Sequence, residues 1–201
     1  MGGIAKVNSA TARSALRMPQ GEAVDAVQLI GRIAQGDQIA LADLYALYGP
    51  PLFRYLVQLV DDRGLAEEVL QDTLVAVWQS AARFEARSTP RTWLYGIARR
   101  QAHNRTRRKA LPRADVSELD LTPAGDTEPE EAVLASVERE ELAHAIDQLT
   151  AAHREILALI FDSGLSYAEA AILLNVPEGT VKSRLNNAKR ALRDSLRAEE
   201  G

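Results

Sequence analysis

The sequence contains no cysteine, so it can form neither a disulfide framework nor a cysteine-ligated zinc site, and it fits a reducing cytoplasm. Its three histidines, His103, His144 and His153, lie in different segments without the spacing of metal ligands, so we expect no metal and no cofactor. The sequence also lacks the run of about 18 apolar residues that a bilayer span requires. No apolar core of a signal peptide follows the first basic residues. We therefore expect a cytoplasmic protein without membrane insertion.

Aromatic residues are scarce, at 5%, whereas 46% of the chain is hydrophobic and Ala and Leu dominate. No segment shows the sustained alternation of apolar and polar residues that is typical of a half-buried strand. The 201 residues are sufficient for one domain or for two small ones. We therefore predict an all-α fold class, with two small helical domains joined by a flexible acidic linker.

The net charge of −4 is small, but the charges are distributed in blocks. The segment from Arg83 to Arg113 is strongly basic, and Glu85 is its single acid. The segment from Ala114 to Glu131 carries acids and no base. Because attraction to phosphate is screened within about 10 Å in solution, these blocks matter more than their sum. The negative net charge of the chain therefore does not exclude a nucleic-acid partner.

Composition shifts predict four segments. We expect a disordered tail over residues 1–21, a first helical domain over 22–110, an acidic linker over 111–131 and a second helical domain over 132–197. Apolar periodicity in the first domain predicts helices over 23–35, 38–48, 51–60 and 65–82, followed by one that starts near Pro90. The sequence Gly49-Pro50-Pro51 is expected to end the second of these helices, because proline lacks an N–H and disfavours helical geometry in the preceding residue.

The stretch from Leu165 to Leu192 predicts two helices joined by a tight turn. Ser166 and Glu169 have the spacing of a capping box at the start of the first helix, and Pro177 is expected to end that helix. An apolar stripe at helical spacing marks the core-facing side of the second helix: Val181, Leu185, Ala188 and Leu192. The rest of its surface is basic and polar, which suits the DNA major groove. An ordinary surface helix pair would show the same pattern, so this stretch alone leaves DNA binding open.

Two further helices in the first domain carry polar faces that need an explanation. The helix over residues 65–82 has an acidic, amide-bearing side, which could be plain solvated surface or a partner-binding face. The helix after Pro90 has arginines concentrated near its far end and aromatic residues close by, which suits melted or single-stranded DNA. A merely cationic helix end is the alternative, although these arginines exceed what the helix dipole needs.

These blocks together resemble the extracytoplasmic-function (ECF) group of bacterial sigma-70 family RNA polymerase sigma factors. The first block reads LAEEVLQDTLVAVWQSAARFEARSTPRTWLYGIARRQAHNRTRR, and the second reads LTAAHREILALIFDSGLSYAEAAILLNVPEGTVKSRLNNAKRAL. The two blocks stand in the order that this group shows and are separated by the acidic segment. The resemblance covers about Val24 to Leu196, nearly everything but the two tails.

The resemblance implies a non-enzymatic protein that binds core RNA polymerase, through the β′ clamp helices and the β subunit, and directs promoter-specific transcription initiation. It also implies an anti-sigma factor as a partner and a linker threaded through the polymerase's nucleic-acid channel. The residues that it implies for the clamp helices are Glu67, Glu68, Gln71 and Asp72. Those implied for recognising and melting the −10 element are Phe84, Arg87, Ser88, Arg91, Trp93, Arg99, Arg100, His103 and Asn104. Those implied for reading the −35 element are Thr180, Lys182, Ser183, Arg184, Asn186, Asn187, Lys189 and Arg190.

The −35 helix departs from the family pattern at two positions. Lys182, Ser183 and Arg184 match the basic-Ser-basic pattern at its start, whereas Asn186 and Asn187 stand where arginine or aromatic residues are often found. Asparagine can form two hydrogen bonds with adenine, so a different −35 sequence is our hypothesis for this chain.

Three other classes of function compete with this interpretation. A stand-alone helix-turn-helix regulator would bind DNA tightly without polymerase, but it would not need the blocks over residues 65–82 and 84–108. An enzyme acting on nucleic acid is disfavoured, because we find no carboxylate cluster, no phosphate-binding glycine loop and no nucleophile-base pair. A pure protein-interaction module stays open, since both domains could serve an anti-sigma factor.

Overall fold

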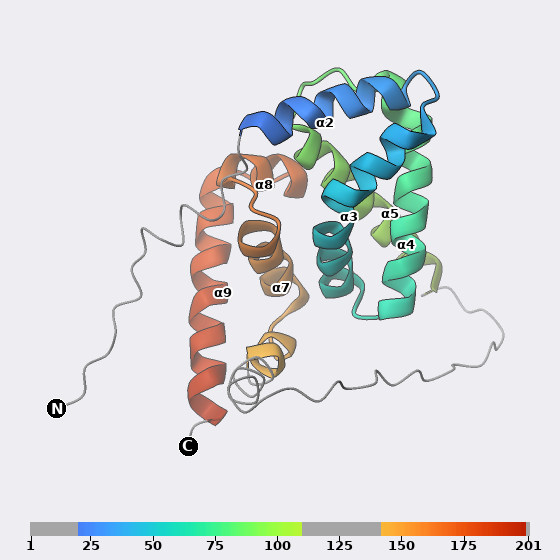
Figure 1. Cartoon of the computed structure of the whole chain (residues 1–201). Helices are drawn as coiled ribbons and strands as arrows, with labels where there is room; N and C mark the ends of the chain where they lie inside the picture. Colours follow the sequence, from blue (N-terminus) through green and yellow to red (C-terminus); the bar gives the residue numbers. More distant parts are fainter. Residues whose placement is uncertain (1–19, 110–141, 200–201) are drawn as a thin grey trace, which may run out of the picture.

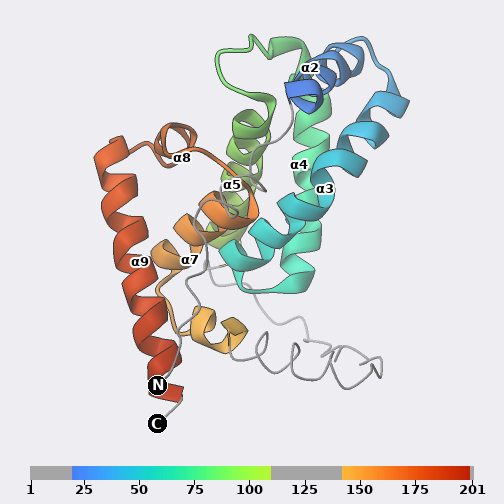
Figure 2. The same cartoon turned by 60° about the vertical axis from the view of Figure 1, so that its left-hand side comes forward.

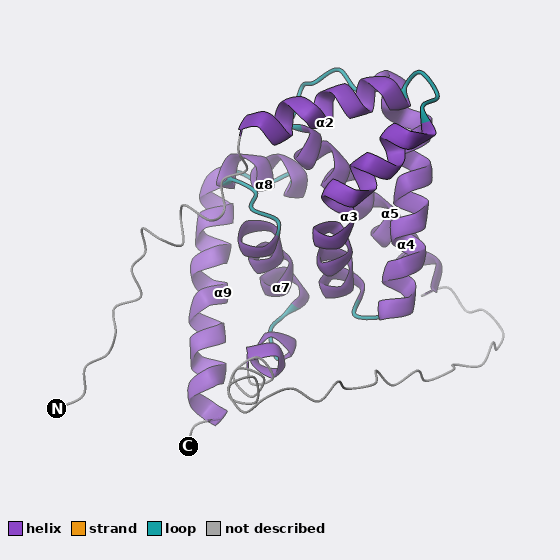
Figure 3. Ribbon diagram, in the orientation of Figure 1, coloured by secondary structure: helices purple, strands orange, loops and turns teal. Residues whose placement is uncertain are grey.

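The computed structural model of the chain describes residues 20–109 and 142–199 (Figure 1). All regular structure in these residues is helical (Figure 3), which confirms the predicted all-α fold class. The acidic linker predicted over 111–131, the first part of the second domain and nearly all of the predicted tail lie outside the described residues. Within the described parts, no helix combines the length and the apolar character needed to cross a membrane.

The first half of the chain forms a group of helices that we call the N-terminal group. Its elements are α2 (Gln20–Ile33), α3 (Gln38–Val60), α4 (Arg63–Ser80), a 3₁₀ turn η1 (Ala81–Arg83) and α5 (Pro90–Lys109). Aspartates fix two of the helix starts. The Asp37 carboxylate accepts hydrogen bonds from the N–H groups of Ile39 and Ala40, and that of Asp62 accepts one from Leu65. These bonds satisfy N–H groups that have no partner within the helix.

Helix α3 runs without interruption through Pro50 and Pro51, so the predicted break at this point is wrong. An internal proline removes a hydrogen bond and typically costs about 3 kcal/mol. Burial of the flanking turns offsets this cost, because apolar side chains pack into the core on both sides of the prolines. The buried residues around the prolines are Tyr48, Gly49, Leu52, Tyr55 and Leu56.

The second half of the chain forms the C-terminal group. A helical segment over 142–147 is followed by α7 (Ala151–Leu157), a π-helical turn η2 (Ala158–Asp162), α8 (Tyr167–Leu174) and α9 (Glu178–Glu199). Thr150 caps α7, since its hydroxyl accepts a hydrogen bond from the N–H of His153 at 3.3 Å. Helices α8 and α9 are the two predicted over the stretch from Leu165 to Leu192.

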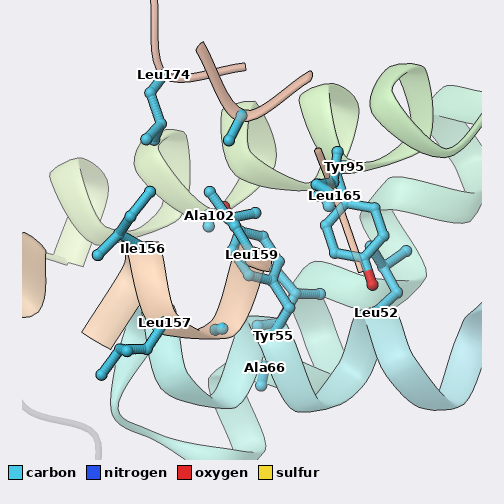
Figure 4. Close-up of a cluster of buried hydrophobic side chains, with 14 of the residues drawn as sticks. Leu52, Tyr55, Ala66, Tyr95, Ala102, Ile156, Leu157, Leu159, Leu165 and Leu174 are labelled. Atoms are coloured by element: carbon cyan, nitrogen blue, oxygen red, sulfur yellow. The ribbon is translucent and has the colours of Figure 1, made fainter. Parts of the chain in front are cut away.

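One hydrophobic cluster draws residues from both groups (Figure 4). Helix α3 packs against α7 and η2, and α5 packs against α8 (Figure 2). Tyr55 and Tyr95 lie with ring centroids 5.1 Å apart in this cluster, together with the fully buried Leu159. A second cluster lies within the N-terminal group, around Ile30 and Leu44. We call this packing of the N-terminal group against the C-terminal group the closed arrangement.

Candidate nucleic-acid and polymerase interfaces

The helix-turn-helix is built from local signals that the sequence predicted. The Ser166 hydroxyl accepts a hydrogen bond from the Glu169 N–H at 3.2 Å, and the Glu169 carboxylate accepts one from the Ser166 N–H at 2.9 Å. These two bonds confirm the predicted capping box. At the other end of α8, Asn175 adopts a left-handed conformation with φ 53°, and Pro177 follows just before α9 begins. Asparagine tolerates this conformation, so the turn requires no glycine.

Helix α9 is divided lengthwise into a buried face and an exposed face. Val181, Leu185 and Ala188 are fully buried against the C-terminal group, which confirms the predicted stripe at these positions. All eight predicted −35 residues lie on the other sides of the helix. Thr180 and Arg184 are half-buried there, and the rest are exposed: Lys182, Ser183, Asn186, Asn187, Lys189 and Arg190. A continuous polar and basic surface is therefore available to a ligand along this helix.

Two lysines of α9 are held over aromatic rings. Lys182 lies 5.8 Å from the ring centroid of Tyr167 and forms an ion pair with Glu178 at 2.7 Å. The hydrogen bond with Glu178 raises the pKa of Lys182, so this lysine keeps its charge at neutral pH. Lys189 lies 5.1 Å from the ring centroid of Phe161. These contacts restrict the lysines, which reduces the entropy lost when they bind phosphate.

A first pocket gathers four of the nine predicted −10 residues. It has a volume of about 230 Å³ and is lined by Phe84, Arg87, Ser88 and Trp93, together with Arg83 and Glu85. The rings of Phe84 and Trp93 are tilted against each other with centroids 5.0 Å apart. Arg87 forms an ion pair with Glu85 at 2.6 Å. Aromatic and cationic side chains around a small pocket suit an unstacked base and its phosphate.

A second pocket extends from Trp93 along α5. Its volume is about 510 Å³. Five predicted −10 residues line it: Ser88, Trp93, Arg99, Arg100 and His103. Ile172 and Leu173 of α8 contribute the opposite wall, so this pocket exists only while the two groups are packed together. The two remaining −10 residues line neither pocket. Asn104 is exposed, and Arg91 donates a hydrogen bond to the Gly164 carbonyl in the C-terminal group at 3.2 Å.

The four residues predicted to contact the polymerase divide into two pairs. Glu68 and Asp72 face α5, where Arg105 bonds both carboxylates at 2.8 and 2.6 Å. Glu67 and Gln71 line a pocket of about 400 Å³ between α3 and α4. Two aromatic side chains that were not predicted as site residues, Tyr45 and Phe53, also line that pocket. Tyr45 has the helical spacing of core residues, and only the packing of α4 shows the two rings at a surface groove.

The structure also brings together residues that lie far apart in the sequence. Glu155 of α7 and Glu169 of α8 each accept hydrogen bonds from residues of the N-terminal group. Burial raises the pKa of Glu169, but the bonds from Thr89, Ser166 and Thr92 outweigh burial and leave that pKa below its usual value. Glu169 is therefore ionised at neutral pH. No local signal marks either contact, since the partners lie far apart in the chain.

Comparison with known families matches two separate segments. Residues 44–111 match the family Sigma-70 region 2, and residues 139–192 match the family Sigma-70, region 4. "ECF RNA polymerase sigma factor SigL" of Mycobacterium tuberculosis (strain H37Rv) is 35% identical over 81% of this chain and 92% of its own. "ECF RNA polymerase sigma factor SigK" of Mycobacterium ulcerans (strain Agy99) is 31% identical over 90% of this chain and 98% of its own.

Solved structures show the same fold. CnrH, in its complex with the cytosolic domain of CnrY, superposes with a TM-score of 0.64 at 24% identity, covering 87% of this chain and 98% of CnrH. At that identity the likeness concerns the fold alone. The sigma factor RpoE of Bartonella quintana, in its complex with the anti-sigma factor NepR, superposes with a TM-score of 0.61 at 26% identity, covering 78% of this chain and 96% of RpoE.

Proposed function

This chain belongs to the ECF group of bacterial sigma-70 factors, and we infer from this that it binds core RNA polymerase and directs transcription initiation at promoters with −10 and −35 elements. The observation that carries the proposal is the presence on one chain of two different surfaces whose side chains suit nucleic acid. Helix α9 offers an exposed basic face for duplex DNA, and the Phe84–Trp93 pocket offers rings for an unstacked base. This role is one of binding, and it requires no catalytic residue of the chain.

Each part of the chain then has a proposed task. Residues 22–110 bind the polymerase and melt the −10 element, residues 111–131 enter the nucleic-acid channel, and residues 132–197 read the −35 element. The exposed carboxylate of Glu67 and the groove beside it support a polymerase contact at α4. Glu68 and Asp72 are paired with Arg105. These two acids can therefore contact the polymerase only if Arg105 moves away or takes part in the same interface.

An anti-sigma factor is the second proposed partner, and the cytoplasm is the proposed location. The complex of RpoE with NepR supports an anti-sigma factor as a partner, because that sigma factor shares this fold over most of the chain. The absence of cysteine from the sequence supports the cytoplasmic location.

Promoter binding with and without polymerase tests this proposal against the stand-alone regulator. We expect the full chain alone to bind a labelled promoter fragment weakly and with little sequence preference, whereas adding core polymerase should produce a sequence-specific footprint over both elements. Tight, specific binding by the chain alone, unchanged by core polymerase, would favour the regulator instead.

Asn187 and Lys189 should affect promoter recognition in different ways. Asn187→Ala removes a side chain able to read adenine, so we expect a loss of about 1–3 kcal/mol at a single −35 base pair and little change at others. Lys189→Ala removes a phosphate contact, so binding should weaken for all sequences and the salt slope should fall by about 1. Holoenzyme binding to a set of −35 variants at several salt concentrations measures both effects. An equal loss across all variants for Asn187→Ala would contradict base reading at this position.

A further inference from the structure

Two aromatic rings of the C-terminal group lie at the surface, outside both hydrophobic clusters. Phe161 is 42% exposed and Tyr167 is 37% exposed, whereas the nearby Leu159 is fully buried. Isolated apolar residues at a surface are common and need no explanation. These two rings differ because each lies against a lysine of α9: Phe161 against Lys189, and Tyr167 against Lys182.

The π-helical turn η2 directs Phe161 outward. Leu157, at the end of α7, is 9% exposed, and a residue four positions later would share its face in a regular α-helix. In η2 the Ser163 N–H instead donates to the Ala158 carbonyl, five residues earlier, at 2.9 Å. The wider turn changes the direction of the side chains, so Phe161 faces solvent while Leu159 stays buried. Single π turns of this kind are frequent at functional sites.

The two lysines share one edge of α9, which lies beside α7 and α8 (Figure 2). They are seven residues apart, nearly two full turns, so they project in almost the same direction about 10 Å from each other. Lys182 directly follows the buried Val181, and Lys189 directly follows the buried Ala188. Both lysines therefore flank the buried stripe, whereas Ser183 lies nearly opposite to it.

This placement determines which part of DNA each side chain can reach. A recognition helix in the major groove, which is about 12 Å wide, turns the surface opposite its buried stripe toward the base edges. Its flanks face the walls of the groove, which are the phosphate backbones. The edge that carries Lys182 and Lys189 therefore faces the phosphates of one wall, and contacts of this kind position a protein on the duplex without reading sequence.

The rings restrain the lysines in a way that leaves them able to bind phosphate. Phe161 holds the Lys189 Nζ at 5.1 Å from its ring centroid, and the ring takes up none of the three N–H donors in a conventional hydrogen bond. Lys182 also pairs with the Glu178 carboxylate at 2.7 Å, which competes with phosphate. Among the described residues no carboxylate forms an ion pair with Lys189, so Phe161 and Lys189 give the clearer case.

We propose that Phe161 and Tyr167 are positioning residues for −35 recognition, whose rings hold Lys189 and Lys182 toward the phosphates along one wall of the major groove. Neither ring belongs to the predicted −35 residues, and each acts through its lysine. The proposal rests on the proposed function for the identity of the DNA. The phosphate contact itself requires neither a particular sequence nor the polymerase.

Substitutions of Phe161 test the role of its ring. Fluorescence anisotropy measures binding of the full chain to a labelled duplex of about 25 base pairs and mixed sequence, at about 50 mM salt. Phe161→Ala should lower the affinity by about two- to fivefold, as expected for the loss of an exposed cation–π contact. Phe161→Trp should restore the affinity, because tryptophan is the best ring for a cation. Phe161→Leu keeps apolar bulk without a ring, so it should bind as weakly as Phe161→Ala.

A double-mutant cycle with Lys189 separates positioning from a structural effect. Lys189→Ala should lower both the affinity and the salt slope, the slope by about 1, whereas Phe161→Ala should lower the affinity alone because Lys189 keeps its charge. Phe161→Ala added to Lys189→Ala should cause no further loss, since the ring then has nothing to position. Leu142→Ala is the matched control: Leu142 is also 42% exposed, lies before α7, and should be replaceable without loss of affinity.

Tyr167 and Lys182 form a second cycle. Tyr167→Ala should cause a smaller loss than Phe161→Ala, because Glu178 also holds Lys182. Tyr167→Phe keeps the ring and should bind normally. A loss for Tyr167→Ala that is equally large in the presence of Lys182→Ala would exclude Tyr167 as a positioning residue.

Three results would overturn the role of Phe161: full affinity in the folded Phe161→Ala variant, an equal loss with and without Lys189, or rescue by leucine as well as by tryptophan. Circular dichroism shows whether each variant is folded, and the comparison of Phe161→Leu with Phe161→Trp remains if the alanine variant is not. Transcription with core polymerase separates this failure from failure of the proposed function. A chain that initiates at its promoter but shows no coupling between ring and lysine keeps the function and loses only the positioning role.

Discussion

Trp93→Ala should reduce promoter opening by about 5- to 150-fold while leaving polymerase binding intact. Trp93 lines both pockets proposed for the −10 element, and its ring packs with Phe84 at a centroid distance of 5.0 Å. Stacking of a base on an aromatic side chain contributes about 1–3 kcal/mol, and it offsets the few kcal/mol needed to unstack that base from the duplex. Losing this contribution corresponds to a roughly 5- to 150-fold lower equilibrium constant for opening. Fluorescence of 2-aminopurine placed in the −10 element measures opening directly.

Trp93→Phe and Trp78→Phe serve as controls for this substitution. Trp93→Phe keeps a ring in the pockets and should retain most of the opening. Trp78 lies in α4 beside the core of the N-terminal group and lines neither pocket, so Trp78→Phe should open the promoter normally. Normal promoter opening by a folded Trp93→Ala variant would contradict a role of Trp93 in melting the −10 element.

Leu159→Ala should destabilise both halves of the chain together. Leu159 has 0% exposure and lies in the cluster that joins the N-terminal group to the C-terminal group (Figure 4). Replacing a buried leucine by alanine costs about 2–5 kcal/mol, because it removes apolar contacts and leaves a cavity. Urea unfolding measures the loss as a lower midpoint at constant slope. Ile39→Ala is the matched control, since Ile39 is 69% exposed and its truncation should stay within about 0.5 kcal/mol of the original stability.

The position of the tryptophans makes this measurement informative about the closed arrangement. Both tryptophans of the chain, Trp78 and Trp93, belong to the N-terminal group, whereas Leu159 belongs to the C-terminal group. If the halves share one core, Leu159→Ala should shift the unfolding transition that tryptophan fluorescence reports. A shift in circular dichroism without a shift in fluorescence would mean that the halves unfold independently.

The helix-turn-helix could be predicted from the sequence because its determinants are local. Ser166 and Glu169 are three residues apart, and the buried positions of α9 recur every three or four residues, so each signal lies within a few turns of chain. The structure places the eight predicted −35 residues on one continuous surface for the same reason. Once the start of α9 and its buried positions are predicted correctly, the side chains on its exposed face follow.

Contacts between distant segments could not be predicted in this way. Arg99 and Glu155 are 56 residues apart, and no periodicity or motif connects them. The same limit explains α3, where Pro50 and Pro51 predicted an end to the helix. Local propensity favours a break there, but burial of the turns on both sides outweighs it, and that burial depends on helices elsewhere in the chain.

In vitro transcription with purified core polymerase tests the central claim most directly. A library of templates with randomised −10 and −35 elements is transcribed by core polymerase with and without the chain, and the products are sequenced. We expect transcripts that appear only with the chain and that start at a fixed distance from one pair of −10 and −35 sequences. If no promoter-specific product appears with a core enzyme that is active with another sigma factor, the chain is not a sigma factor for that polymerase.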